Sequence, residues 1–396
     1  MNRTFKKLDE TFQFPIEKRT NVWYNNFEQM FLKGVWAMGE LSLAAFCDRF
    51  DNEEACVRAL VDAKWPNGFV CPKCEGREAY VIRSRRLPLF DCKSCRHQTS
   101  ATAGTVMEGS RTSLVKWFRS MFLFAAPGGT NAVRLASDIE VTYKTAWLIL
   151  HKLRHAVTNA DKSVPLSGIV RVNTSTYGSK LNPTVFRLPE EHPLLAGATL
   201  HPDGHFTYVK MKQAPDCYIA GLSVSKHGGQ AFISQHVHPQ TTDLVCITGK
   251  YDPNRCRPLL DLCKQAYRWL NDTFHGLGAK HLQAYLDDYC FRINQSFQGH
   301  NPFLRLCRMC ATTAVITYKS LINRGPAFSF LYQPPAIPAG YEELRPHFIK
   351  WYAKITGVVG DGHSASIVPI CGFPMATETG KPYLTHPCPT TSAPTS

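Results

Sequence analysis

Four cysteines in two matched pairs constrain this sequence more than any other feature. Cys71 and Cys74 form one pair, Cys92 and Cys95 form the other, and 17 residues separate the pairs. A spacing of two residues lets both thiolates of a pair reach one ion from a tight turn. We therefore predict a structural Zn²⁺ site with four thiolate ligands. The alternative is four structural cysteines that bind no metal.

The segment between the two pairs has the composition of a hairpin. Residues 79–83 and 87–90 are apolar enough to form short strands, and the basic residues 84–86 lie between them as a turn. Such a hairpin would return the second cysteine pair to the first. The sequence therefore predicts a zinc ribbon over residues 67–101.

The chain carries a strong positive charge that is not evenly distributed. Its 396 residues include 45 Lys and Arg against 31 Asp and Glu, which gives a net charge of +14. Residues 71–157 alone contain 14 Lys and Arg against 6 Asp and Glu. A basic surplus beside a zinc ribbon favours double-stranded DNA as the partner. A basic surface that only confers solubility is the alternative.

The cysteine content does not indicate a secreted protein. The chain has 15 cysteines, but it also has enough apolar residues for a sizeable core without disulfide bonds. Its first residues are polar, and no apolar stretch is long enough to span a membrane. We expect a reducing, cytoplasmic, nucleoid-associated setting and no membrane partner.

Two amphipathic helices are predicted after the ribbon, over residues 130–138 and 142–157, with a three-residue turn between them. This is the outline of a helix-turn-helix, although an ordinary pair of core helices would have the same pattern. The N-terminal end of the second helix would meet base edges, and Lys152 and Arg154 would contact phosphates. The predicted DNA-binding residues are Arg83, Arg85, Arg86, Arg96, Thr142, Tyr143, Lys144, Thr145, Lys152 and Arg154.

The second half of the chain changes to a pattern of strands followed by helices. Strands are expected at 168–172, 206–211, 218–224 and 244–248, and helices from about 257 to 297. This order predicts an α/β domain. The expected organisation is an N-terminal helical region (1–66), the zinc ribbon (67–101), the helix-turn-helix (102–160), the α/β domain (161–300) and a partly disordered C-terminal extension (301–396).

Several motifs resemble those of one family. Residues from about 43 to 294 are similar to bacterial insertion-sequence transposases that join a zinc ribbon to a DDE domain of ribonuclease-H-like fold. The segments that carry this resemblance are Trp65–Cys74, Phe90–Ser100, Tyr143–Trp147, Lys280–Tyr289 and Phe291–Asn294.

The resemblance implies a catalytic centre with two Mg²⁺ ions held by acidic side chains, two of them aspartates. The family positions fall on Asn173, Gly249, Asp261 and, for an accompanying lysine, Arg268. The first two positions have lost their carboxylates, and Arg171 lies beside the first. Asp261 also follows Gly249 by only twelve positions, so a strand and a helix of the family fold are expected to be missing.

We therefore expect a catalytically degenerate transposase-family protein that recognises insertion-sequence ends, or a derived site, without strand transfer. One alternative is an active, Mg²⁺-dependent enzyme that uses Asp243 or Asp252 with Asp261 and Asp288. Another is a protein-interaction module. Asp287 and Asp288 are expected to form salt bridges, and a second copy of the chain is a further expected partner.

Overall fold

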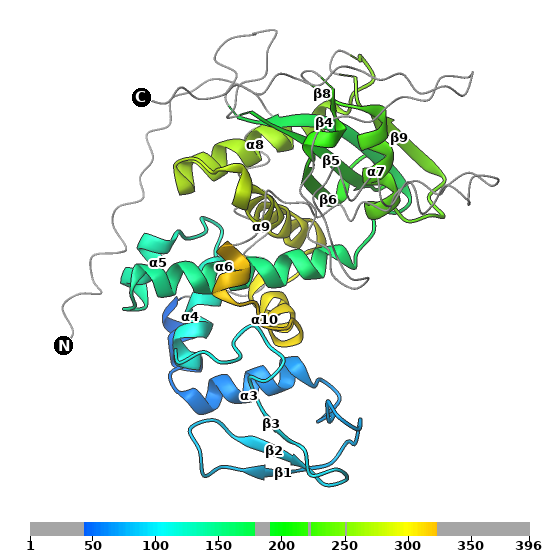
Figure 1. Cartoon of the computed structure of the whole chain (residues 1–396). Helices are drawn as coiled ribbons and strands as arrows, with labels where there is room; N and C mark the ends of the chain where they lie inside the picture. Colours follow the sequence, from blue (N-terminus) through cyan, green and yellow to red (C-terminus); the bar gives the residue numbers. More distant parts are fainter. Residues whose placement is uncertain (1–42, 179–190, 221–222, 250–251, 323–396) are drawn as a thin grey trace, which may run out of the picture. The chain divides into compact units, whose positions relative to one another are not determined.

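The computed structural model describes residues 43–178, 191–220, 223–249 and 252–322, and Figure 1 shows their arrangement. Apart from residues 215–218, they belong to one compact unit. The predicted region before residue 43 and the predicted extension after residue 322 lie outside the described residues. Across these ranges, no helix combines the length and the apolar character needed to cross a bilayer.

The ribbon is a small antiparallel sheet of strands β1 (Ala79–Ile82), β2 (Leu89–Cys92) and β3 (Gln98–Ser100), in the order β1-β2-β3. Val81 pairs with Phe90, so the turn between β1 and β2 contains the three basic-turn residues predicted from the sequence. Phe90 is buried and packs against the rings of Trp65 and Phe69. Both predicted ribbon strands are confirmed.

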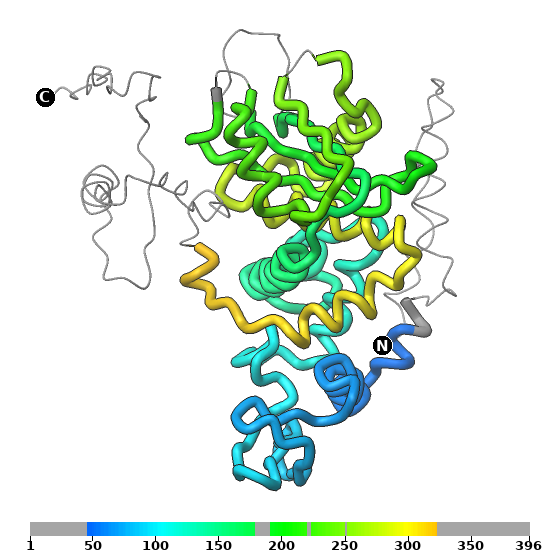
Figure 2. Tube along the Cα trace, turned by 90° about the vertical axis from the view of Figure 1, so that its right-hand side faces the viewer, coloured from blue at the N-terminus to red at the C-terminus, as the bar shows by residue number. Residues whose placement is uncertain are grey.

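A helical layer adjoins the ribbon and includes segments from both halves of the chain. Its core combines aromatic side chains such as Phe46, Trp117 and Phe118 with aliphatic ones such as Leu60 and Leu153. Figures 1 and 2 show α10 returning to the earlier helices, and it contacts α3, α4 and α6. The helices are α2 (Leu43–Arg49), α3 (Glu53–Lys64), α4 (Leu114–Ala125), α5 (Ala132–Asp138), α6 (Tyr143–Lys162) and α10 (Pro302–Thr312).

The second half is built on a four-stranded sheet in the order β6-β5-β4-β9. β5 is antiparallel to both of its neighbours, β4 and β6, and β9 is parallel to β4. Helix α7 (Lys226–His236) provides the connection that a parallel strand requires. The strands are β4 (Ile169–Tyr177), β5 (His192–Leu200), β6 (Phe206–Gln213) and β9 (Asp243–Ile247).

Helices cover both faces of this sheet. Helices α8 (Arg257–Phe274) and α9 (Ala279–Gln298) share an apolar core with Leu194, Ala196 and Met211 of the sheet. Helix α7 covers the other face at Gly197, where an added Cβ would lie only 2.8 Å from the ring of Phe232. A short helix, α11 (Tyr318–Ile322), ends the described residues.

Two amide side chains of α9 occupy the free edge of β6. Asn294 accepts a hydrogen bond from the Val209 amide at 2.7 Å and donates one to the Val209 carbonyl at 2.9 Å. Gln283 accepts from the Gln213 amide at 2.7 Å and donates to the Met211 carbonyl at 3.0 Å. Backbone groups that would otherwise be left without partners at a buried sheet edge are thereby satisfied.

Two strand expectations are corrected. β5 was not expected, and it is central in the sheet, between β4 and β6. The single strand expected over 218–224 is wrong, because β7 (Ile219–Ala220) and β8 (Ser223–Val224) pair antiparallel with each other. A 3₁₀ turn, η1 (Asp216–Tyr218), precedes them.

Candidate metal centre and nucleic-acid interface

The four cysteines converge into one cluster. Their sulfur atoms all lie within 4.8 Å of one another, and the Cys71–Cys95 and Cys74–Cys92 sulfurs are 3.6 Å apart. A tetrahedron with metal–sulfur bonds of about 2.3 Å has sulfurs about 3.8 Å apart, whereas a disulfide bond is about 2.05 Å long. The geometry therefore fits a single Zn²⁺ ion held by four thiolates. Among the described residues, this is the one group of three or more Cys, His, Asp or Glu side chains arranged to hold a metal ion.

The pKa values of two thiols in the cluster shift in opposite directions. The backbone amides of Cys95 and Ser94 lower the pKa of the Cys92 thiol to about 6. The Gly76 amide acts in the same direction on Cys74, but the neighbouring cysteines raise the pKa of Cys74 to about 12 overall. Four thiolates at this separation repel one another, so a divalent ion is needed to ionise all of them together.

Both cysteine pairs lie in turns of the same geometry. The residue after each pair, Glu75 or Arg96, has a positive φ of 59° or 57°. The amide of each donates to the carbonyl of the first cysteine of its pair at 2.9 Å. Gly76 follows the first turn, and a Cβ there would lie 3.2 Å from the Cys92 sulfur and 3.3 Å from the Cys74 sulfur. Glycine therefore leaves room for the sulfur cage.

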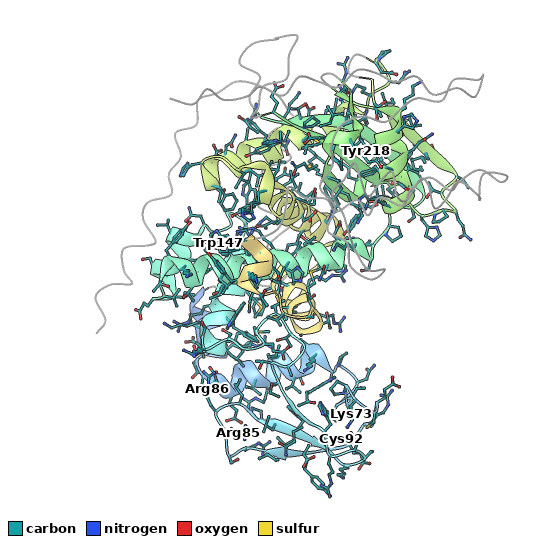
Figure 3. The ribbon with its side chains drawn as sticks, in the orientation of Figure 1. Lys73, Arg85, Arg86, Cys92, Trp147 and Tyr218 are labelled. Carbon is teal, nitrogen blue, oxygen red and sulfur yellow. The ribbon has the colours of Figure 1, made fainter. Side chains whose placement is uncertain are left out.

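The basic residues predicted on the ribbon are exposed. Arg85 and Arg86 lie in the β1–β2 turn, at the opposite end of the hairpin from Cys92 (Figure 3). Arg86 is 3.4 Å from the Glu53 carboxylate, and its own side chain remains 55% exposed whereas that of Glu53 is half-buried. Arg83 is exposed nearby, and Arg96 lies beside the zinc cluster with its guanidinium 5.8 Å from the ring centroid of Tyr80.

Helices α5 and α6 are joined by the turn expected from the sequence. Glu140 has a positive φ of 51°, a conformation that costs a glutamate roughly 1 kcal/mol relative to glycine. The Lys116 ammonium donates to the Glu140 carbonyl at 2.9 Å and so stabilises this turn. Thr142 caps α6 through its hydroxyl, which accepts a hydrogen bond from the Thr145 amide at 3.3 Å.

The N-terminal end of α6 presents the predicted reading residues to solvent. Tyr143 is 57% exposed, Thr142 and Lys144 are exposed, and Thr145 is half-buried. These four side chains share one turn of helix. That turn is accessible to a macromolecular partner.

The phosphate contacts expected for Lys152 and Arg154 are revised, because both side chains are buried. Arg154 is 1% exposed, and its Nε donates to the Asp288 carboxylate at 3.1 Å. Its guanidinium also lies 3.9 Å from the ring centroid of Tyr285. Burial lowers the pKa of Lys152. Neither side chain is accessible to the phosphates of a duplex.

Asp288 and Asp287 form buried salt bridges, as expected from the sequence. Asp288 is fully buried between Arg154 and Arg292, with the Arg292 Nε at 2.9 Å. The Arg292 guanidinium also donates to the Phe124 and Ala126 carbonyls. These contacts join α9 to α4 and α6.

Asp287 belongs to a second buried network. Its carboxylate accepts from the Lys212 ammonium at 2.6 Å and from the Thr158 hydroxyl at 2.8 Å. Lys212 and Lys210 also pair with Asp161 at the end of α6. Burial raises the pKa of Asp161, but the two lysines outweigh it and hold that pKa below its usual value. Asp287 and Asp288 of α9 therefore both form buried structural ion pairs.

The positions at which the resemblance predicts catalytic residues lie on the sheet, just after it and on α8. Asn173 is on β4, where it pairs in register with Ile247 of β9, and Gly249 follows β9 by two residues. Asp261 is on α8 with its side chain 59% exposed, and it pairs with Lys264 at 2.8 Å. Arg268 is exposed on the same helix.

The surroundings of Asn173 do not fit a pair of Mg²⁺ ions. Asn173 is 1% exposed, and its side-chain oxygen accepts a hydrogen bond from the Cys256 amide at 3.2 Å. The Arg255 guanidinium donates to the adjacent Thr174 carbonyl. Arg171 lies two residues before Asn173, on the same face of β4, and its guanidinium pairs with the Asp243 carboxylate at 2.7 Å. The guanidinium groups repel a divalent cation, and the amide of Asn173 supplies no negative charge, so the carboxylates that a pair of Mg²⁺ ions requires are missing here.

Comparisons with known proteins agree with the ribbon. Residues 51–98 match the family model described as the transposase zinc-ribbon domain, of the IS1595 type. A relative from Halobacterium salinarum, described as an uncharacterised protein in the transposable element ISH50, is 31% identical over 111 residues. That match covers 27% of this chain and 37% of the relative, so the chain spans well under half of it.

No solved structure matches the chain. The resemblance to zinc-ribbon transposases is thus confirmed over the segment that carries the four cysteines, and residues 51–98 of this chain are similar to the transposase zinc-ribbon domain.

Proposed function

We propose that this chain is a transposase-related protein that binds double-stranded DNA through its zinc ribbon and its α5–α6 helix pair, without strand transfer. The observation that carries the proposal is a transposase zinc ribbon whose cysteines are arranged for one Zn²⁺ ion and whose hairpin turn exposes Arg85 and Arg86. Exposed arginines on a metal-stabilised hairpin suit the phosphates of a duplex.

The α5–α6 pair acts as a helix-turn-helix in this proposal. Its second helix offers Thr142, Tyr143 and Lys144 from an exposed first turn. Those are the positions from which a recognition helix meets base edges in the major groove. The site on DNA would be an insertion-sequence end or a sequence derived from one, and binding there implies a cytoplasmic, nucleoid-associated protein.

The sheet with α7, α8 and α9 is a degenerate ribonuclease-H-like domain in this proposal. Two of the family's metal positions fall on neighbouring parallel strands, at Asn173 on β4 and at Gly249 just after β9. Only nine residues separate the end of β9 at Ile247 from the start of α8 at Arg257. That short connection supports the expected loss of a strand and a helix between the second and third positions.

The alternative active centre finds no support in the described acidic residues. Asp288 is fully buried between two arginines, and Asp243 is held by Arg171. Asp252 accepts a hydrogen bond from the Asn254 amide in the loop before α8. Each of these carboxylates contacts a different partner. The proposed function therefore assigns no role to Mg²⁺.

Salt dependence of DNA binding tests the proposal. Each phosphate contact releases counterions, so log K falls as log salt concentration rises, and the double variant Arg85→Ala, Arg86→Ala should make this negative slope shallower by about 2. Fluorescence anisotropy with a labelled duplex measures this slope. The matched control is Lys264→Ala, Arg268→Ala, which removes two exposed charges from α8 and should leave the slope unchanged. Equal slopes for the wild type and the arginine variant would exclude the hairpin turn from the interface.

A further inference from the structure

Lys144 contacts an aromatic ring from a distant segment. Its ammonium lies 5.3 Å from the ring centroid of Tyr318, the first residue of α11. The ring is 41% exposed, and Lys144 is exposed as well. Within the described residues, no carboxylate forms an ion pair with Lys144. The contact therefore orients the ammonium and leaves its charge available to an anionic partner.

Tyr318 is itself held against α6. Its ring is 6.0 Å from the ring of Trp147, in an edge-to-face arrangement with an interplanar angle of 71°. Trp147 packs in turn on His151 and His281. Leu321, one turn along α11, is fully buried. Figures 1 and 3 show α11 (orange) against α6 at the level of Trp147.

A lysine at the exposed start of a helix ordinarily samples many rotamers. Binding a phosphate or a base edge then requires the side chain to be ordered, which weakens the complex. A ring that already holds the ammonium over its face reduces this loss. The ring must come from an element that is fixed relative to α6, and the contacts of Trp147 and Leu321 provide that.

We propose that Tyr318 is a positioning residue, which holds the Lys144 ammonium at the DNA-facing end of α6. The inference rests on the proposed DNA-binding function of that helix. It extends the interface beyond the helix pair, to a segment more than 150 residues further along the chain. The partner of Lys144 is double-stranded DNA.

A double-mutant cycle tests the coupling in the full-length protein. The variants are Tyr318→Leu, which removes the ring, Lys144→Met, which removes the charge but keeps the aliphatic stem, and their combination. We expect Tyr318→Leu to weaken binding of a labelled duplex roughly two- to five-fold, the effect of an exposed cation–π contact. In the Lys144→Met background, the same change should have no further effect. Tyr318→Phe keeps the ring and should bind like the wild type.

The outcomes separate the inference from the function on which it rests. If Lys144→Met binds DNA like the wild type, the end of α6 does not contact DNA and the proposed function fails there. If Lys144→Met weakens binding and Tyr318→Leu does not, the positioning role alone is overturned. If Tyr318→Leu weakens binding equally in both backgrounds, the ring contacts DNA itself or supports the fold. Weakened binding by Tyr318→Phe would assign the effect to the hydroxyl group, which also overturns the inference.

Discussion

Removal of zinc is expected to unfold the ribbon and to leave the helical layer and the sheet folded. Between residues 71 and 100, Phe90 is the only large hydrophobic side chain that is buried, so the metal takes the place of a hydrophobic core. Structural zinc sites contribute about 10–16 kcal/mol in apparent binding free energy. A strong chelator should therefore abolish hydrogen-exchange protection of the amides in β1 and β2.

The helices and the sheet have cores of their own, and these serve as the internal reference for that experiment. Amides of α6 and β5 should keep their protection after chelation, because both elements pack in clusters formed mostly outside the ribbon. Cys92→Ser should lower the zinc content well below about one ion per chain, whereas the exposed Cys217→Ser should retain it. Undiminished protection of β1 and β2 in zinc-free protein would contradict a metal-held ribbon.

Replacing Asp288 with asparagine is expected to be the most destabilising conservative substitution in the buried ion network. The change keeps the shape of the side chain but removes the only negative charge between Arg154 and Arg292 among the described contacts. All three side chains are at most 6% exposed. Loss of one partner from such a buried network costs about 3–5 kcal/mol, because the remaining charges are left uncompensated.

Chemical unfolding of the Asp288→Asn variant measures this cost. The matched control is Asp261→Asn, which makes the same chemical change on the exposed surface of α8 and should cost no more than about 1 kcal/mol. If Asp288 were instead a ligand in a cluster of catalytic carboxylates, its neutralisation would relieve repulsion. An unchanged or increased stability of Asp288→Asn would therefore refute its assignment as the counter-charge.

The parts of the molecule that could be predicted from the sequence are those determined by local spacing. The two cysteine pairs lie in turns of four to five residues, so the spacing of the cysteines is enough to predict the geometry of the metal site. The α5–α6 turn is also local, and Glu140 adopts the left-handed conformation that its position in the motif requires. Both features depend on short stretches of backbone and little on the rest of the fold.

The parts that could not be predicted depend on partners far along the chain. Arg154 was expected at a phosphate because it lies on a basic helix, but its counter-charge Asp288 is 134 residues away. The side-chain amide of Asn294 forms hydrogen bonds with the backbone amide and carbonyl of Val209, which is 85 residues away. β5 was missed because a central strand buried on both faces lacks the alternation of polar and apolar residues. A single sequence contains no direct signal of such pairings.

A DNA cleavage assay on a duplex that carries the terminal sequences flanking this gene tests most directly whether the protein lacks strand-transfer activity. The assay contains Mg²⁺ and enough protein to bind the duplex, and native and denaturing gels resolve its products. We predict a retarded complex without nicks or strand-transfer products, both for the wild type and for Asp261→Ala. Metal-dependent cleavage at the ends of the element that Asp261→Ala abolishes would contradict the account, because it would require a functional catalytic metal site on the sheet.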